Sequence, residues 1–121
     1  MAESHSLGEQ GEELAAAYLK EKGYRILHRN WKSGKKELDI VAENKDYVVF
    51  VEVKTRTEKF LANPQDTISR EKMKFMIFAA DVYIRRYNIN KESRFDIVTI
   101  IAKGENFTIE HLENAFYPTL R

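Results

Sequence analysis

Residues 37–56 read ELDIVAENKDYVVFVEVKTR, and they predict two adjoining β-strands. This stretch contains two runs that are rich in Val, Ile and Phe, residues 37–43 and 47–56, and such runs are typical of β-strands. Only three polar residues separate the runs, so an antiparallel hairpin is the natural connection.

The hairpin register brings two acids together. A loop of two or four residues pairs Asn44 with Tyr47 and therefore sets Asp39 opposite Glu52, whereas an odd-length loop or a bulge would shift the register. Opposed side chains in an antiparallel pair have Cβ atoms about 4.5–5.5 Å apart, and like charges there destabilise the sheet. Two carboxylates so placed require a proton, a lysine or a metal cation between them.

Lys54 adds a positive charge to the same face. Strand side chains alternate, so Glu52 and Lys54 share a face with Phe50 on a strand that otherwise looks buried. Magnesium commonly takes one or two carboxylates together with waters and phosphate oxygens. A Mg²⁺ (or Mn²⁺) ion held by Asp39 and Glu52 would activate water and stabilise charge on a phosphodiester, and Lys54 would act on the nucleophile or the transition state.

A buried ion-pair cluster is the alternative explanation of the same pattern. In this interpretation Glu37 pairs with Lys54, and Asp39 pairs with a nearby arginine. The pattern of charges alone does not separate the two explanations. Buried ion pairs often add little stability, which favours a functional site.

A helix is predicted over residues 7–22, with Ser6 and Glu9 forming a capping box at its start. Glu12 lies at the edge of the apolar stripe of this helix, from which it can reach the sheet, although a helix glutamate is usually a surface residue. Glycine is costly inside a helix, so Gly8 and Gly11 indicate a close approach of the backbone to the sheet or to a ligand.

The other elements complete a mixed sheet with helices packed on it. The order αβββαββ predicts an α/β fold and a single domain over residues 1–121, with residues 1–6 expected to be flexible. The further predicted segments are a strand at 24–30, a polar connection at 31–36, a polar loop at 57–66, a helix at 69–87, a strand at 94–101, a turn at 103–106 and a short strand at 107–109.

Composition sets the class of protein. The chain has 121 residues, 43% of them hydrophobic, and no cysteine, which excludes a disulfide scaffold and a thiol nucleophile and suits a reducing compartment. Residues 1–6 lack the features of a signal peptide, and no apolar run approaches the roughly 20 residues that cross a bilayer. A cytoplasmic domain without a membrane partner is expected.

Positive charge is concentrated in residues 20–36, although the net charge of the chain is only +1. Such a run is often a solvated face, but it is also the pattern of a phosphate-binding surface. Trp31 within it is expected to pack rather than to stack on a base. The predicted nucleic-acid contacts are Arg25, Arg29, Lys32, Lys35, Lys36, Arg56 and Lys72.

Asp39 followed by Glu52-Val53-Lys54 resembles the PD-(D/E)xK nuclease motif. The surrounding residues make the resemblance more specific, because together they are similar to the YraN-like bacterial family over most of the chain. The matching segments are Gly8-x-x-Gly11-Glu12-x-x-Ala15-x-x-Tyr18-Leu19, Gly23-Tyr24, Asn30-Trp31, residues 37–42, residues 50–56, Lys72 and Arg94-Phe95-Asp96-Ile97-Val98.

The resemblance implies a restriction-endonuclease-like fold similar to archaeal Holliday junction resolvases. It implies a helix glutamate at Glu12, metal carboxylates at Asp39 and Glu52, and a catalytic lysine at Lys54, together with nucleic-acid binding and a homodimer. Lys36 stands where that family usually has glycine. This departure adds a positive charge beside the site.

A metal-dependent endonuclease on DNA, branched or flapped, is the function predicted, with RNA as a second substrate class. Two rivals remain. One is a nucleic-acid-binding module on the same fold without catalysis, and the other is a protein-interaction domain with a structural ion-pair cluster. Fold transfers between relatives more readily than activity does.

Overall fold

The computed structural model describes residues 6–58 and 68–118. The elements are α1 (Leu7–Glu21), β1 (Arg25–Ser33), β2 (Lys36–Glu43), β3 (Tyr47–Thr57), α2 (Arg70–Arg86), β4 (Glu92–Lys103) and β5 (Asn106–Phe116). The predicted order αβββαββ is therefore confirmed. The predictions for residues 1–5 and for most of the loop at 57–66 lie outside the described residues.

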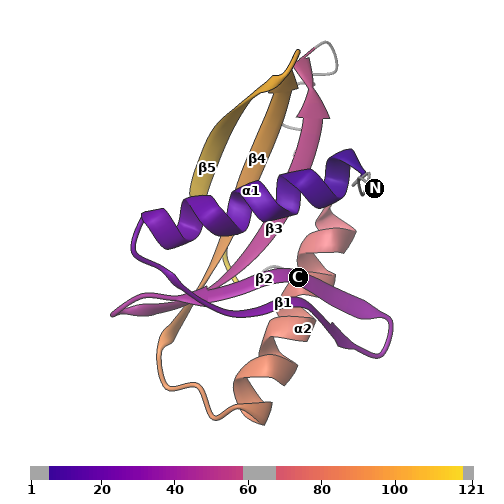
Figure 1. Cartoon of the computed structure of the whole chain (residues 1–121). Helices are drawn as coiled ribbons and strands as arrows, with labels where there is room; N and C mark the ends of the chain where they lie inside the picture. The colour runs from indigo at the N-terminus through magenta and orange to yellow at the C-terminus, as the bar shows by residue number, and fades with distance from the viewer. Residues whose placement is uncertain (1–5, 59–67, 119–121) are drawn as a thin grey trace, which may run out of the picture.

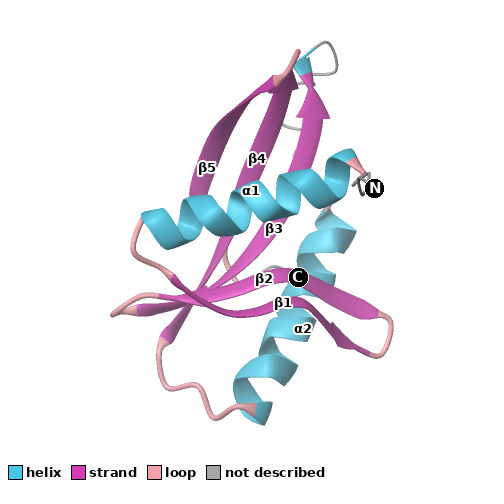
Figure 2. Ribbon diagram, viewed as in Figure 1, coloured by secondary structure: helices cyan, strands magenta, loops and turns pink. Residues whose placement is uncertain are grey.

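The strands form one mixed sheet in the order β1-β2-β3-β4-β5. Only β3 and β4 are parallel, and α2 lies between them in the chain, as a parallel connection requires. The other neighbouring strands are antiparallel. Figures 1 and 2 show α1 on one side of the sheet and α2 on the other, with the β1–β2 hairpin running across the direction of β3, β4 and β5.

Each helix seals a separate apolar core against its own face of the sheet. Small residues of α1 let that helix lie close to the strands. The α1 core contains Ala15, Ala16, Leu19, Ile40, Ala42, Val49, Val51, Val98 and Ile100. The α2 core is richer in aromatic residues and includes Val41, Val48, Phe50, Met76, Ala79, Ala80, Tyr83 and Phe95. The candidate site lies where β2 and β3 extend beyond these two cores.

The capping box at the start of α1 is confirmed. The Ser6 hydroxyl accepts from the Glu9 amide at 3.1 Å, and the Glu9 carboxylate accepts from the Ser6 amide at 2.9 Å. These bonds satisfy two amides that have no partner within the helix. They fix the first turn of α1, which carries Glu12 toward the sheet in the next turn.

Two predicted segments have the wrong bounds, the connection at 31–36 and the strand at 107–109. Residues 31–33 belong to β1, and only a tight turn with Gly34 at φ 61° joins β1 to β2. Trp31 is 7% exposed and donates to the Tyr87 hydroxyl at 3.3 Å, so it packs against α2 as expected. The last strand is much longer than the predicted residues 107–109, because three consecutive exposed residues, 112–114, interrupt the alternation before the strand ends at Phe116.

Candidate active site

The predicted hairpin register is confirmed as far as Ile40, which pairs with Val51. Beyond this pair the predicted opposition of Asp39 and Glu52 is not a backbone pair, because the described ladder between β2 and β3 ends there. Asp39 Oδ2 instead accepts from the Val53 amide at 2.9 Å. The two carboxylates therefore approach each other at the point where the strands separate.

Burial makes this carboxylate pair hard to ionise. Burial, followed by the negative charge of Asp39, raises the pKa of Glu52 to about 7. Burial also raises the pKa of Asp39, although the hydrogen bond from Val53 and the charge of Lys72 oppose it. Loss of hydration destabilises the charged form of each acid, and the like charge of its neighbour adds to the cost. A cation bound between them would relieve both penalties.

Glu12 and Lys54 complete the predicted set of catalytic residues around this pair. Glu12 from α1, with Glu52, Lys54 and Arg56 from β3, lines a pocket of about 360 Å³. Burial, and next the negative charge of Asp39, raise the pKa of Glu12. Burial, and next the positive charge of Arg56, lower the pKa of Lys54. Three elements, α1, β2 and β3, thus bring four titratable groups to one site.

Lys72 contributes a fourth element to the site. Its Nζ lies 3.6 Å from Glu52 Oε1, and the Glu52 side chain is only 13% exposed. Lys72 was predicted as a phosphate contact, and its pairing with Glu52, a predicted catalytic residue, was not foreseen. The ion-pair alternative is only partly met, because no salt bridge joins Glu37 to Lys54 in the described part of the chain.

The donor set fits a hard divalent cation. In residues 6–58 and 68–118, no three His, Cys, Asp or Glu side chains converge as a ready-made metal site. Asp39 and Glu52 supply two carboxylates, which is the usual protein share of a magnesium site whose other ligands are water and substrate oxygens. The negative charge of this partly buried pair is the feature that a cation would compensate.

Gly11 lets α1 approach β3 closely. A Cβ at this position would lie 2.0 Å from Thr55 Oγ1 and 3.1 Å from Thr55 Cβ. The predicted close approach of the backbone is thus confirmed for Gly11. At Gly8 it is not, because a Cβ there would meet only Ser6 Oγ at 3.9 Å.

Gly11→Ala is expected to lower the free energy of unfolding by about 1–2 kcal/mol, since overpacking costs more than the gain in helix propensity returns. Gly8→Ala is the matched control and should be neutral or stabilising by up to about 1 kcal/mol. Chemical denaturation of both variants measures the difference. Equal stability of the two would contradict the close packing of α1 on Thr55.

The predicted phosphate contacts do not form one cluster. Arg56 and Lys72 lie at the site. Arg29 lies nearby on β1, where it pairs with Glu13 at 3.3 Å, and Lys32 and Lys35 are exposed beside the β1–β2 turn. Arg25 is at the other end of β1 and pairs with Glu43 at 3.4 Å, so its predicted role is the least compatible with the geometry.

The family model described as uncharacterised protein family UPF0102 matches residues 11–100. The chain belongs to the UPF0102 family. It is 48% identical over 120 residues to a UPF0102 protein of Phocaeicola vulgatus, covering 99% of each chain. A UPF0102 protein of Parabacteroides distasonis is 46% identical over the full length of both chains, and one of Flavobacterium psychrophilum is 40% identical over 97% of this chain and 98% of its own. The resemblance to an uncharacterised YraN-like family is thereby confirmed.

A buried polar network in this UPF0102 chain was missed by the sequence analysis. Asp96 is fully buried, and its carboxylate binds Arg94 through two hydrogen bonds of 2.9 and 2.8 Å. It also accepts from the Asn114 amide at 3.0 Å and contacts His111 Nε2 at 2.7 Å. His111 Nδ1 is 3.0 Å from the Tyr18 hydroxyl. The network joins β4 and β5 to α1, and the charged pair Arg94-x-Asp96 within a buried strand was its only local signal.

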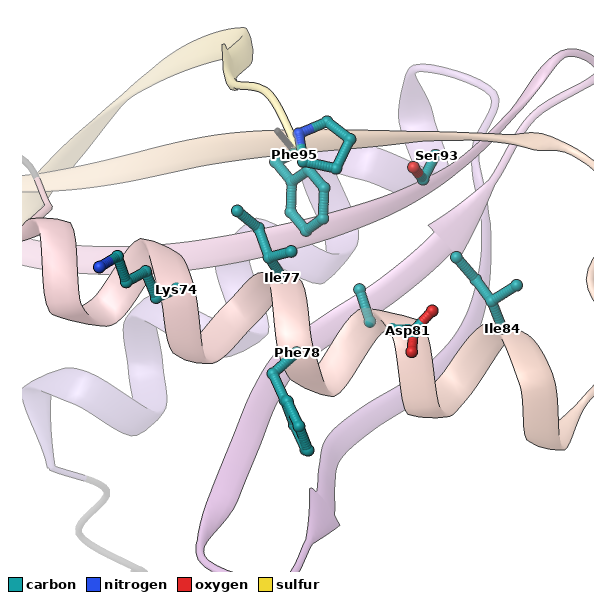
Figure 3. Close-up of a pocket in the computed structure, with 9 residues that line it drawn as sticks. Lys74, Ile77, Phe78, Asp81, Ile84, Ser93 and Phe95 are labelled. Carbon is teal, nitrogen blue, oxygen red and sulfur yellow. The ribbon is translucent and has the colours of Figure 1, made fainter. Parts of the chain in front are cut away.

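A second pocket of the UPF0102 chain, about 470 Å³ in volume, lies between α2 and β4. Figure 3 shows Ile77 facing Phe95 on one side of α2, while the Phe78 ring points away from them. None of the four predicted catalytic residues lines this pocket. Neither α1 nor α2, the helices within the described ranges, is long and apolar enough to cross a membrane.

Proposed function

We propose that this protein is a metal-dependent phosphodiesterase that cuts DNA, and that branched or flapped DNA is its preferred substrate. One observation carries the proposal: Asp39 and Glu52, two partly buried carboxylates from adjoining strands, approach each other beside the pocket that Glu12, Glu52 and Lys54 line. Buried acids with raised pKa values beside a lysine with a lowered one are typical of catalytic sites.

Asp39 and Glu52 would hold Mg²⁺ or Mn²⁺, with Glu12 acting through a water molecule. The bound cation would supply Lewis-acid stabilisation of the phosphodiester and a more acidic water. Lys54, whose pKa is lowered, is suited to orient the attacking water or to neutralise charge that develops on the phosphate. Lys72, which pairs with Glu52, and Arg56, which lines the pocket, would bind the phosphates next to the cut bond.

The experiment that tests this proposal is a cleavage assay with labelled duplex, flap, four-way junction and RNA in the presence of Mg²⁺ or Mn²⁺. The expected result is metal-dependent cutting of at least one DNA substrate, with flap or junction cut faster than duplex. If no substrate is cut, the enzymatic proposal fails. Calorimetric titration with Mn²⁺ then separates the rivals, because a binding module without catalysis shows salt-sensitive nucleic-acid binding and no carboxylate-dependent metal binding. An interaction domain with a structural ion-pair cluster shows neither.

Stability of the metal-free protein should depend on Glu52. The folded pKa is about 7 against an ordinary value of 4.5, so folding takes up a proton between these values, and the free energy of unfolding falls as the pH rises through this interval. At pH 8 the ionised Glu52 is expected to lower the free energy of unfolding by an amount on the order of 2 kcal/mol. Glu52→Gln avoids this destabilisation, so we expect the variant to have a Tm at pH 8 that is higher by roughly 5–10 °C.

Magnesium should restore stability to the wild-type protein and not to Glu52→Gln. A ligand that binds only the folded state stabilises it by mass action, and here it also removes the repulsion between the acids. Thermal melts at pH 5.5 and pH 8, with and without Mg²⁺, give the four values needed. A Tm that is independent of Glu52 at both pH values would contradict the burial argument.

A further inference from the structure

Two phenylalanines on the outer side of α2 are exposed beside the site. Phe75 is 45% and Phe78 58% exposed, although an aromatic side chain gains most by burial. The ammonium of Lys36 lies 5.0 Å from the centre of the Phe75 ring and 4.8 Å from that of Phe78. One cation from the start of β2 thus holds two aromatic rings in place on α2.

This aromatic pair lies close to the carboxylates. Lys36 precedes Asp39 by three residues of β2, which corresponds to about 10 Å along an extended strand. Phe75 follows Lys72 by three residues of α2, a rise of about 4.5 Å, and Lys72 contacts Glu52 at 3.6 Å. A strand that keeps the stacked spacing of duplex DNA rises about 3.4 Å per nucleotide, so about three nucleotides would span the distance from Lys36 to Asp39.

The surrounding charges favour an anionic partner. Lys35, next to Lys36 in the chain, and Lys74, next to Phe75, are exposed, and Lys72, which contacts Glu52, is partly exposed. The acids on the outer side of α2 are Glu71 and Asp81, and Asp81 is paired with Arg85 at 3.2 Å. A lysine over the rings is unfavourable in the dry centre of a protein interface, where lysine is depleted. It is favourable where a phosphate must be bound.

We propose that Phe75, Phe78 and Lys36 form a binding site for unpaired nucleotides of a DNA strand, with the bases stacked on the rings and a phosphate bound by the ammonium. This inference rests on the proposed function and specifies its substrate, since it assigns the single-stranded arm of a flap or branch to α2. Bases within a duplex are already stacked on each other, so the rings discriminate in favour of an unpaired strand.

The test is fluorescence anisotropy in EDTA, where metal-dependent cutting does not occur. The ligands are a labelled single-stranded oligonucleotide, its duplex and an abasic strand of equal length. The double variant Phe75→Leu, Phe78→Leu should bind the single strand at least about tenfold more weakly and bind the abasic strand as the wild type does. Lys36→Ala should weaken binding to both strands, while Lys20→Ala, at an exposed position in the last turn of α1, should weaken neither. Circular dichroism checks that the variants are folded.

Equal affinity of the double variant and the wild type for the single strand would overturn the stacking site. An equal loss of affinity for the abasic strand would also overturn it. So would a wild type that self-associates and binds no DNA, if the double variant no longer self-associates. The two proposals fail separately. If the wild type cuts DNA with Mg²⁺ and the double variant at Phe75 and Phe78 still binds single strands as the wild type does, only the stacking site is refuted. Protein that stacks bases on these rings but cuts nothing refutes only the phosphodiesterase.

Discussion

Asp39→Asn is expected to lower the rate of metal-dependent DNA cleavage by at least about a hundredfold, with the fold intact. The substitution removes one of two metal carboxylates, and the asparagine oxygen can still accept from the Val53 amide that Asp39 binds at 2.9 Å. Removing this charge also relieves the repulsion that raises the pKa of Glu52. Single-turnover cleavage of a flap substrate with Mg²⁺ measures the rate, and a thermal melt measures the fold.

Asp46→Asn is the matched control, since Asp46 is an exposed acid in the turn of the same hairpin. It should cleave at the wild-type rate. Lys54→Ala should resemble Asp39→Asn in rate, yet keep carboxylate-dependent binding of Mn²⁺ in a calorimetric titration. Wild-type rates for both Asp39→Asn and Lys54→Ala would exclude this pocket as the site of cleavage.

Asp96→Asn is expected to lower the free energy of unfolding by roughly 3–5 kcal/mol, because it removes the buried charge partner of the Arg94 guanidinium. A change of this size should lower the Tm by more than about 10 °C. Asp96 is fully buried, and Arg94 is 8% exposed. Glu113→Gln is the control: Glu113 also faces Arg94, at 3.7 Å, but its side chain is 58% exposed, so its removal should cost little.

The network also predicts a response to acid. Burial alone would raise the pKa of Asp96, but hydrogen bonds from His111, Arg94 and the Asn114 amide hold it below the ordinary value of 3.8. A carboxyl group with a lowered folded pKa stabilises the protein above its unfolded pKa, and this contribution is lost as the pH falls through the folded value. The stability difference between wild type and Asp96→Asn, measured by denaturation, should therefore shrink below pH 3.8. A constant difference down to pH 2 would contradict the role of the charge.

Local patterns were sufficient to predict the hairpin and the face on which its charges lie. Alternation has a fixed period of two and the loop is short, so the register through Ile40 and Val51 follows from the spacing alone. The same logic placed Glu52 and Lys54 on one face. The family resemblance supplied Glu12, which the helical pattern alone left as a surface candidate.

The remaining features depend on tertiary geometry that no local pattern encodes. The end of the β2–β3 ladder depends on the twist of the hairpin, which no spacing rule contains. The contact of Lys72 with Glu52 requires the packing position of α2, and the contact of His111 with Tyr18 joins residues 93 positions apart. Arg25 was grouped with the other basic residues by position in the sequence, although β1 carries it to the opposite end of the sheet from the site.

The early separation of β2 from β3 has a consequence for solubility. From Glu52 to Thr57, the described part of β3 has β4 as its only neighbouring strand. On its other edge the Val53 amide donates to Asp39, and the rest of that edge has no strand beside it in residues 6–58 and 68–118. Free edges invite strand addition and aggregation, and proteins commonly protect them with charged side chains. Glu52, Lys54 and Arg56 lie along this edge, so the side chains proposed to bind metal and phosphate would also hinder its pairing with a strand of another molecule. Apolar replacements there should promote self-association as well as abolish activity.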